Sequence, residues 1–112
     1  MSEIVSVDTV EAMTRSTSGT WLLDVREQSE WDLGHSPLAH LIPLSELGSR
    51  LEEIPTGQQV LVVCRSGARS LRAASALIGA GFEAVNVSGG MLAWSQAGGE
   101  LVAESQAPPR IE

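Results

Sequence analysis

The chain has 112 residues, with seven arginines, no lysine and 14 acidic residues, so its formal charge is −7. This length fits one domain, and 43% hydrophobic with 19% charged residues indicates a globular chain rather than a disordered one. The acidic balance argues against nucleic acid or an anionic membrane as a partner, no apolar run is long enough to span a bilayer, and the first residues lack the pattern of a secretory signal.

Short apolar runs alternate along the chain with segments of helical pattern. We expect strands at 4–7, 21–25, 39–43, 60–63 and 84–87. The expected helices run from Asp8 to a break at Gly19, over 27–33, from Ser45 along an apolar stripe of Leu47, Leu51 and Ile54, over 70–80, and from Gly89–Gly90 through Trp94.

This alternation predicts an α/β fold, with a mainly parallel sheet of five strands and helices on both faces. Residues 60–63 are the most hydrophobic strand and are uninterrupted, which is typical of a strand buried on both faces. We take residues 1–103 as the domain. Residues 104–112 contain two prolines and little apolar content, and are interpreted as a C-terminal tail outside the core.

The candidate nucleophile is Cys64, which directly follows the most hydrophobic strand. In open α/β sheets, ligands bind beyond the carboxyl ends of the strands. The loop after Cys64 leads into a helix whose free N–H groups favour an anion, and the acid-free stretch 54–82 carries three arginines. These features favour the thiolate, the nucleophilic form, over the alternative of an inert buried cysteine. A lone cysteine excludes a disulfide within the chain and suits a reducing cytoplasm.

Four stretches carry a family resemblance: LLDVRE at 22–27, GHSPLAHLIP at 34–43, VVCRSGARS at 62–70 and GGMLAW at 89–94. Together, and in this order, they resemble the single-domain rhodaneses, or thiosulfate sulfurtransferases. Ser36 and Leu38 replace an isoleucine and a glycine of the family's GHIPGA segment, and a residue with a Cβ resists positive φ. Trp31 stands where phenylalanine or tyrosine is more usual. The resemblance implies a rhodanese-like three-layer fold.

The loop length separates two chemistries within this resemblance. Cys64 and Arg69 form a C-x4-R loop. The resemblance implies that a loop of this length serves sulfur transfer, whereas related phosphatases carry a longer C-x5-R loop. We therefore expect Cys64 to take sulfane sulfur from thiosulfate or a similar donor as a persulfide and to pass it to a thiol, to cyanide or to a protein. The residues expected to bind the persulfide are Arg65, Ser66, Gly67, Ala68, Arg69 and Ser70.

Other functions stay open at this stage. The chain could be a persulfide carrier in a sulfur relay, loaded by a protein partner such as a cysteine desulfurase. A cysteine-dependent phosphatase or arsenate reductase is disfavoured by the loop length, and a redox sensor would need an external thiol. The physiological donor and acceptor and the oligomeric state cannot be read from the sequence.

Three further residues are expected to support the site. Asp24 and Arg26 follow the second strand, where we expect a structural role, and His35 is expected to fix a turn by hydrogen bonding. His35 and His40 lack a convincing third ligand, so we expect no metal and no other cofactor. A nucleophile–base pair of Cys64 and His35 is disfavoured because the loop itself favours the thiolate. The three tryptophans are interpreted as core residues.

Overall fold

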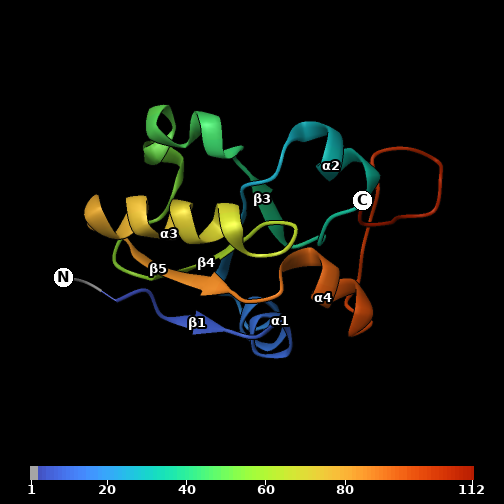
Figure 1. The fold of residues 1–112 in the computed structure, drawn as a ribbon, viewed down its shortest axis with the longest axis horizontal. Helices are drawn as coiled ribbons and strands as arrows, with labels where there is room; N and C mark the ends of the chain where they lie inside the picture. Colours follow the sequence, from blue (N-terminus) through green and yellow to red (C-terminus); the bar gives the residue numbers. More distant parts are fainter. Residues whose placement is uncertain (1–2) are drawn as a thin grey trace.

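The computed structural model describes residues 3–112, and within this range five strands form one sheet (Figure 1). The strands are β1 (Ser6–Val7), β2 (Trp21–Asp24), β3 (Ala39–Leu41), β4 (Gln59–Val63) and β5 (Glu83–Val87). Their order across the sheet is β1-β5-β4-β2-β3, and every neighbouring pair is parallel. The predicted mainly parallel sheet of five strands is thus confirmed.

Helices cover both faces of the sheet, which gives three layers (Figure 1). They are α1 (Thr9–Thr17), α2 (Gln28–Leu33), α3 (Ala68–Gly79) and α4 (Gly90–Gln96), with two short 3₁₀ segments, η1 (Leu44–Ser49) and η2 (Leu51–Glu53). α3 and the 3₁₀ segments pack on one face, and α1 and α4 pack on the other (Figure 1). Over residues 3–112, no helix combines the length and the apolar character that crossing a membrane requires.

The central strand β4 connects the two halves of the core. Its four apolar residues, Val60, Leu61, Val62 and Val63, are fully buried. Because side chains alternate along a strand, Val60 and Val62 pack with α3, while Leu61 and Val63 pack with α1 and α4. This burial on both faces explains why the strand is apolar without alternation.

Helix α1 begins where the sequence predicts. Asp8 is its N-cap, and its Oδ1 accepts a hydrogen bond of 2.8 Å from the amide of Glu11. The Glu11 carboxylate does not complete a capping box; it pairs with Arg15 one turn later. The helix ends before Gly19, whose φ of +108° suits glycine.

The helix predicted from Ser45 is wrong in type. The segment forms η1 and η2, and η1 begins after Pro43 rather than with Ser45 as a cap. Gly48 lies inside the segment and Pro55 follows it, which favours short 3₁₀ pieces over one continuous α-helix. The apolar stripe faces the core as predicted, because Leu47 and Ile54 are buried there.

The turn at Leu38 needs no glycine. Among residues 3–112, no residue other than glycine has a positive φ, and Leu38 is therefore unstrained. Ser36 closes the turn: its hydroxyl accepts from the amide of Leu38 at 3.2 Å, and its carbonyl accepts from the amide of Ala39 at 3.1 Å.

The C-terminal segment 104–112 runs back along α2. The amide of Glu104 donates to the carbonyl of Asp32 at 3.0 Å, and the amide of Arg110 donates to that of Leu33 at 2.9 Å. Ile111 is partly buried and packs against the half of the core that includes Met91 and Trp94 of α4. The segment therefore contacts the domain, and the division at residue 103 stays a prediction.

Candidate active site

The candidate nucleophile and the charged residues expected near it lie at the carboxyl edge of the sheet. Asp24 at the end of β2 is paired in register with Val63 at the end of β4, and Cys64 follows directly. Val60, Val62 and Cys64 face the same side of the sheet, so the thiol lies under the amino end of α3. The residue is 1% exposed. Its sulfur thus lies at the base of the 64–70 loop rather than on the surface.

Backbone amides of this loop point at the sulfur. The amide of Gly67 donates to Cys64 Sγ at 3.0 Å, and the thiol donates to Ser70 Oγ at 3.3 Å. Gly67 is the N-cap of α3 and has a φ of +128°, a conformation that side chains with a Cβ rarely adopt. The glycine thereby lets the chain curl around the sulfur and start a helix at once.

The loop changes the acidity of the thiol. Burial raises the pKa of Cys64, since the charged form loses hydration. Hydrogen bonds from the Ser70 hydroxyl and from the amides of Ser70, Gly67 and Ser66 lower that pKa. The lowering is the larger effect, so the thiol is more acidic than an ordinary cysteine.

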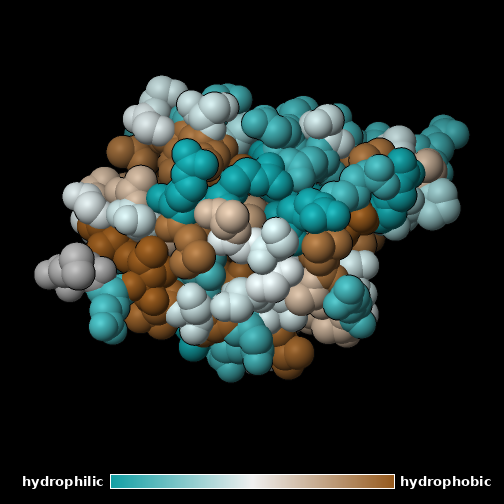
Figure 2. Space-filling model, viewed as in Figure 1, coloured by the Kyte–Doolittle hydropathy of each residue, from teal (hydrophilic) through white to brown (hydrophobic). Residues whose placement is uncertain are grey.

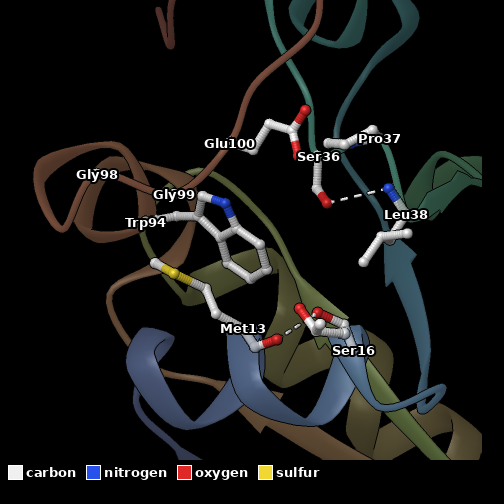
Figure 3. A pocket seen from close by; sticks show the side chains of 10 residues that line it. Met13, Ser16, Ser36, Pro37, Leu38, Trp94, Gly98, Gly99 and Glu100 are labelled. Atoms are coloured by element: carbon white, nitrogen blue, oxygen red, sulfur yellow. Dashed lines mark hydrogen bonds between the residues drawn. The ribbon is translucent and has the colours of Figure 1, made fainter.

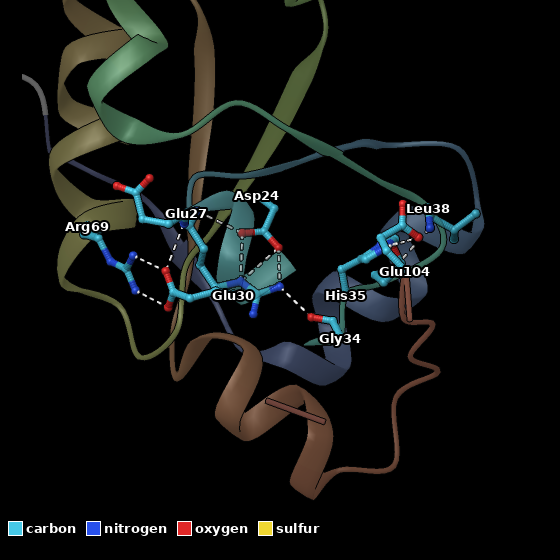
Figure 4. A network of polar contacts seen from close by, with 10 residues as sticks. Asp24, Glu27, Glu30, Gly34, His35, Leu38, Arg69 and Glu104 are labelled. Atoms are coloured by element: carbon cyan, nitrogen blue, oxygen red, sulfur yellow. Dashed lines mark hydrogen bonds and ion pairs between the residues drawn. The ribbon is translucent and has the colours of Figure 1, made fainter. Parts of the chain in front are cut away.

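Arg69 belongs to this loop, and its guanidinium group is held by a carboxylate (Figure 4). Its Nη1 and Nη2 donate to Glu30 of α2 at 2.6 and 2.8 Å. This pairing lowers the pKa of Glu30, and it raises that of Arg69, which the charge of Cys64 raises further. The guanidinium is thus fixed in place near the sulfur. No local sequence pattern indicates this role of Glu30, because 39 residues separate it from its partner.

Arg65 and Arg72 lie on the outer side of the loop, toward solvent. Arg65 is exposed, and its Nε donates to the carbonyl of Glu112 at 2.8 Å. Arg72 lines an open hollow of about 500 Å³ beside the loop, together with Glu27, Leu44, Ser45, Arg69 and Ala76. Hydrophilic residues gather over α2 and the amino end of α3 (Figure 2). A small polar or anionic molecule can therefore approach the loop over a polar surface.

Asp24 and Arg26 form a fully buried ion pair (Figure 4). Arg26 Nε and Nη2 donate to the Asp24 carboxylate at 2.8–3.1 Å, and Nη2 also donates to the carbonyl of Gly34 at 2.8 Å. The pair ties the end of β2 to the end of α2. Within residues 3–112, the hydrogen bonds of these two side chains do not involve Cys64, which supports a structural role for both.

The two histidines stack on different tryptophans. His35 lies against Trp31 with ring centroids 3.5 Å apart, and His40 lies against Trp21 at 4.1 Å. His35 Nδ1 also contacts the Ser36 carbonyl at 3.0 Å, and its backbone bridges to Val102. These contacts agree with a structural role of His35 in its turn, which stays a prediction. Within residues 3–112, the hydrogen bonds of His35 do not involve Cys64. Desolvation lowers the pKa of His40.

A second hollow, of about 200 Å³, lies away from the loop (Figure 3). Trp94, Met13 and Gly99 line it, and its walls include no residue of the 64–70 loop. Trp94 is 3% exposed and belongs to the core. Cys64 and its loop do not line this hollow, so it is not the candidate site.

The amino end of α4 supports the loop from beneath. The amide of Met91 donates to the Cys64 carbonyl at 2.8 Å, and that of Leu92 donates to the Arg65 carbonyl at 3.0 Å. Gly90 makes this approach possible, because a Cβ there would overlap the carbonyl groups of Cys64 and Arg65, and its φ is +59°. Gly90 of the GGMLAW motif therefore lets α4 approach the backbone of the nucleophile.

We expect Gly90→Ala to displace the active-site loop and to reduce both stability and the reactivity of Cys64. The added methyl group meets backbone atoms that cannot rotate away. Gly79→Ala is the matched control, since a Cβ at that helical position meets nothing within 4 Å. Thermal unfolding and the rate of thiol alkylation measure both effects. Equal stability and reactivity in the two variants would contradict this role of Gly90.

The fold and the loop define a class: a parallel α/β domain with a cysteine held by amides at the carboxyl edge of the sheet. The model of the family described as "Rhodanese-like domain" matches residues 6–97, so the chain belongs to this family.

Individual relatives agree with this assignment. The chain is 39% identical to "Thiosulfate sulfurtransferase 18" of Arabidopsis thaliana, over 82% of this chain and 79% of that protein. It is 34% identical to "Putative sulfur carrier protein YrkF" of Bacillus subtilis, over 81% of this chain but 50% of that protein. The crystal structure of a rhodanese-like domain protein from Staphylococcus aureus superposes with a TM-score of 0.82 at 32% identity, covering 91% of this chain and all of that one.

Proposed function

We propose that this protein is a sulfurtransferase, in which Cys64 carries the transferred sulfur. The observation that carries the proposal is the loop geometry: amides converge on the sulfur, and Gly67 donates to it at 3.0 Å. A ring of N–H groups stabilises a negative charge on sulfur, both on the thiolate and on a persulfide. Family membership and a relative named thiosulfate sulfurtransferase support the same activity.

The proposed reaction has two halves. The Cys64 thiolate attacks the terminal sulfur of thiosulfate; a new S–S bond forms as the bond to sulfite breaks, and sulfite leaves with the electron pair. An acceptor thiolate or cyanide then attacks the outer sulfur of the persulfide, and Cys64 leaves as the thiolate. Atoms and electrons balance in both halves of the reaction without a cofactor. Neither half requires a base at the sulfur once the thiolate has formed.

The arginines serve this reaction in different ways. Both terminal nitrogens of Arg69 already bind Glu30, so this residue supplies charge near the sulfur at a fixed position. Arg65 and Arg72 lie on the outside, where they favour the approach of an anionic donor and the departure of sulfite. We place the protein in a reducing compartment such as the cytoplasm, because a lone reactive thiol persists there.

The test is the mass of the intact protein after incubation with excess thiosulfate. The proposal predicts the addition of one sulfur atom, and the loss of that sulfur when cyanide or dithiothreitol is added. Cys64→Ser is expected to keep its mass unchanged. A wild-type protein that gains no sulfur under donor excess speaks against thiosulfate as a donor.

The second candidate function is a persulfide carrier that a protein partner loads. A relative named putative sulfur carrier protein favours it, and so does the burial of Cys64, which limits access to the sulfur. The two functions differ in their donor. Slow turnover of thiosulfate with rapid loading by a cysteine desulfurase supports the carrier, whereas saturable turnover of thiosulfate with cyanide supports the free-standing enzyme.

A further inference from the structure

A chain of hydrogen bonds leads away from the nucleophile across three elements. The thiol of Cys64 donates to Ser70 Oγ at 3.3 Å, and this hydroxyl donates to Asn86 Oδ1 of β5 at 2.7 Å. The amide group of Asn86 continues the chain, as its Nδ2 donates to Ser6 Oγ of β1 at 3.2 Å. Ser70 and Asn86 are buried, and Ser6 is exposed, so the chain runs from the sulfur to the surface.

Asn86 is a polar residue in an otherwise apolar part of β5. It is the only asparagine of the protein and interrupts the apolar residues Val85 and Val87 at 3% exposure. Burying an amide side chain is unfavourable unless its donor and acceptor are both satisfied. Here the two partners are hydroxyl groups, each of which can either donate or accept.

The hydroxyl group of Ser70 cannot donate a hydrogen bond to all of its neighbours at once. It has one proton, and the surrounding acceptors are Asn86 Oδ1, the Gly67 carbonyl at 3.1 Å and the sulfur. The contact with Asn86 is the shortest, which is the arrangement that suits a protonated thiol. A thiolate accepts only, so it needs the Ser70 proton to point at the sulfur.

Rotation of the Asn86 side-chain amide by half a turn provides that arrangement. Nδ2 then donates to Ser70 Oγ, the Ser70 proton turns to the sulfur, and Oδ1 accepts the proton of Ser6. In both directions, the side-chain oxygen and the side-chain nitrogen of Asn86 each keep one hydrogen-bond partner. The Gly67 carbonyl does not depend on Ser70, because it also accepts from the amide of Leu71 at 3.1 Å.

We infer that Asn86 is a positioning residue for the nucleophile: its amide reverses direction with the charge on Cys64 and orients the Ser70 hydroxyl toward the thiolate or persulfide. Ser6 closes the outer end of this chain. The inference rests on the proposed function in that it takes Cys64 as the sulfur carrier, and it names the residue that adapts the site to each charge state.

Other charged groups around the loop act independently of this chain. Arg69 and Glu30 form one pair on the side of α2, Asp24 and Arg26 form another at the end of β2, and Arg65 lies outside. Within residues 3–112, none of these charged side chains forms a hydrogen bond with the side chain of Ser70 or Asn86. We therefore expect a substitution of Asn86 to affect Cys64 through Ser70 and to leave these ion pairs unchanged.

The test is a double-mutant cycle on the pH dependence of Cys64 alkylation by iodoacetamide in the full chain. In Asn86→Asp, the ionised carboxylate can only accept hydrogen bonds. The Ser70 hydroxyl therefore keeps donating to this carboxylate, and the Cys64 thiolate loses that hydrogen bond. We expect the inflection to move up by about one pH unit, with an alkylation rate roughly tenfold lower below it. We expect most of this shift to disappear when Asn86→Asp is combined with Ser70→Ala. Gln59→Glu makes the same change of charge at the other end of the sheet and should leave the profile unchanged.

Two outcomes would overturn the inference. An unchanged profile in Asn86→Asp shows that the amide does not act on the sulfur, and a shift that persists in full without the Ser70 hydroxyl shows a plain charge effect. If the buried carboxylate prevents folding, Asn86→Ala replaces it: we expect a smaller upward shift, again absent in the Ser70→Ala background. The profile of the wild type does not depend on any sulfur donor, so a protein that fails to take sulfur from thiosulfate still tests this inference.

Discussion

Replacing Cys64 by serine is expected to reduce thiosulfate:cyanide sulfur transfer by about 10³-fold or more, because the reaction loses the atom that carries the sulfur. A serine hydroxyl fits the space and can bond with Ser70 and the Gly67 amide, so we expect the protein to stay folded. Steady-state kinetics and thermal unfolding measure the two effects separately.

Ser66→Ala is the matched control in the same loop. Its side chain is exposed and only its amide supports the sulfur, so the variant should keep most of the activity. Residual transfer in Cys64→Ser comparable to that of Ser66→Ala would show that the thiol is not the sulfur carrier.

Asp24→Ala is expected to destabilise the fold by about 3–5 kcal/mol, since it leaves the Arg26 charge buried without its partner. The pair is fully buried, and Arg26 also holds the carbonyl of Gly34. The ends of β2 and α2 should loosen together, and activity should fall with stability. Chemical denaturation measures the change in the free energy of unfolding.

Glu46→Ala provides the comparison, because it also removes the carboxylate of an arginine pair, but at the surface. Arg50 keeps Glu53 as a second partner, and exposed pairs contribute little. If Asp24→Ala kept full stability and lost only activity, Asp24 would act in the chemistry rather than in the fold.

Most of the fold could be predicted from local patterns. Each strand lies in a short, mostly apolar run, and residues 60–63 of β4 are uninterrupted because both faces of this strand are buried. The helix type of the segment after Pro43 could not be predicted, since the spacing of Leu47, Leu51 and Ile54 identifies a buried face but does not distinguish an α-helix from 3₁₀ turns.

The site could be predicted where its residues are neighbours in sequence. Cys64, the loop and the start of α3 form one continuous segment, and their geometry follows from a strand that ends and a helix that begins. Glu30 and Asn86 reach the site from distant segments, so no local pattern identified them. One signal was present for Asn86: a lone amide within an apolar strand requires polar partners.

The central claim is that the loop stabilises a negative charge on the sulfur of Cys64, and the pH dependence of wild-type alkylation tests it most directly. Only the thiolate reacts, so the rate rises with pH through the pKa of the thiol and then levels off. The lowered pKa of Cys64 predicts an inflection at a lower pH than that of a cysteine in an unstructured peptide measured in the same buffer. An inflection at or above that of the peptide, or a thiol that stays unreactive while the protein is folded, would contradict the account.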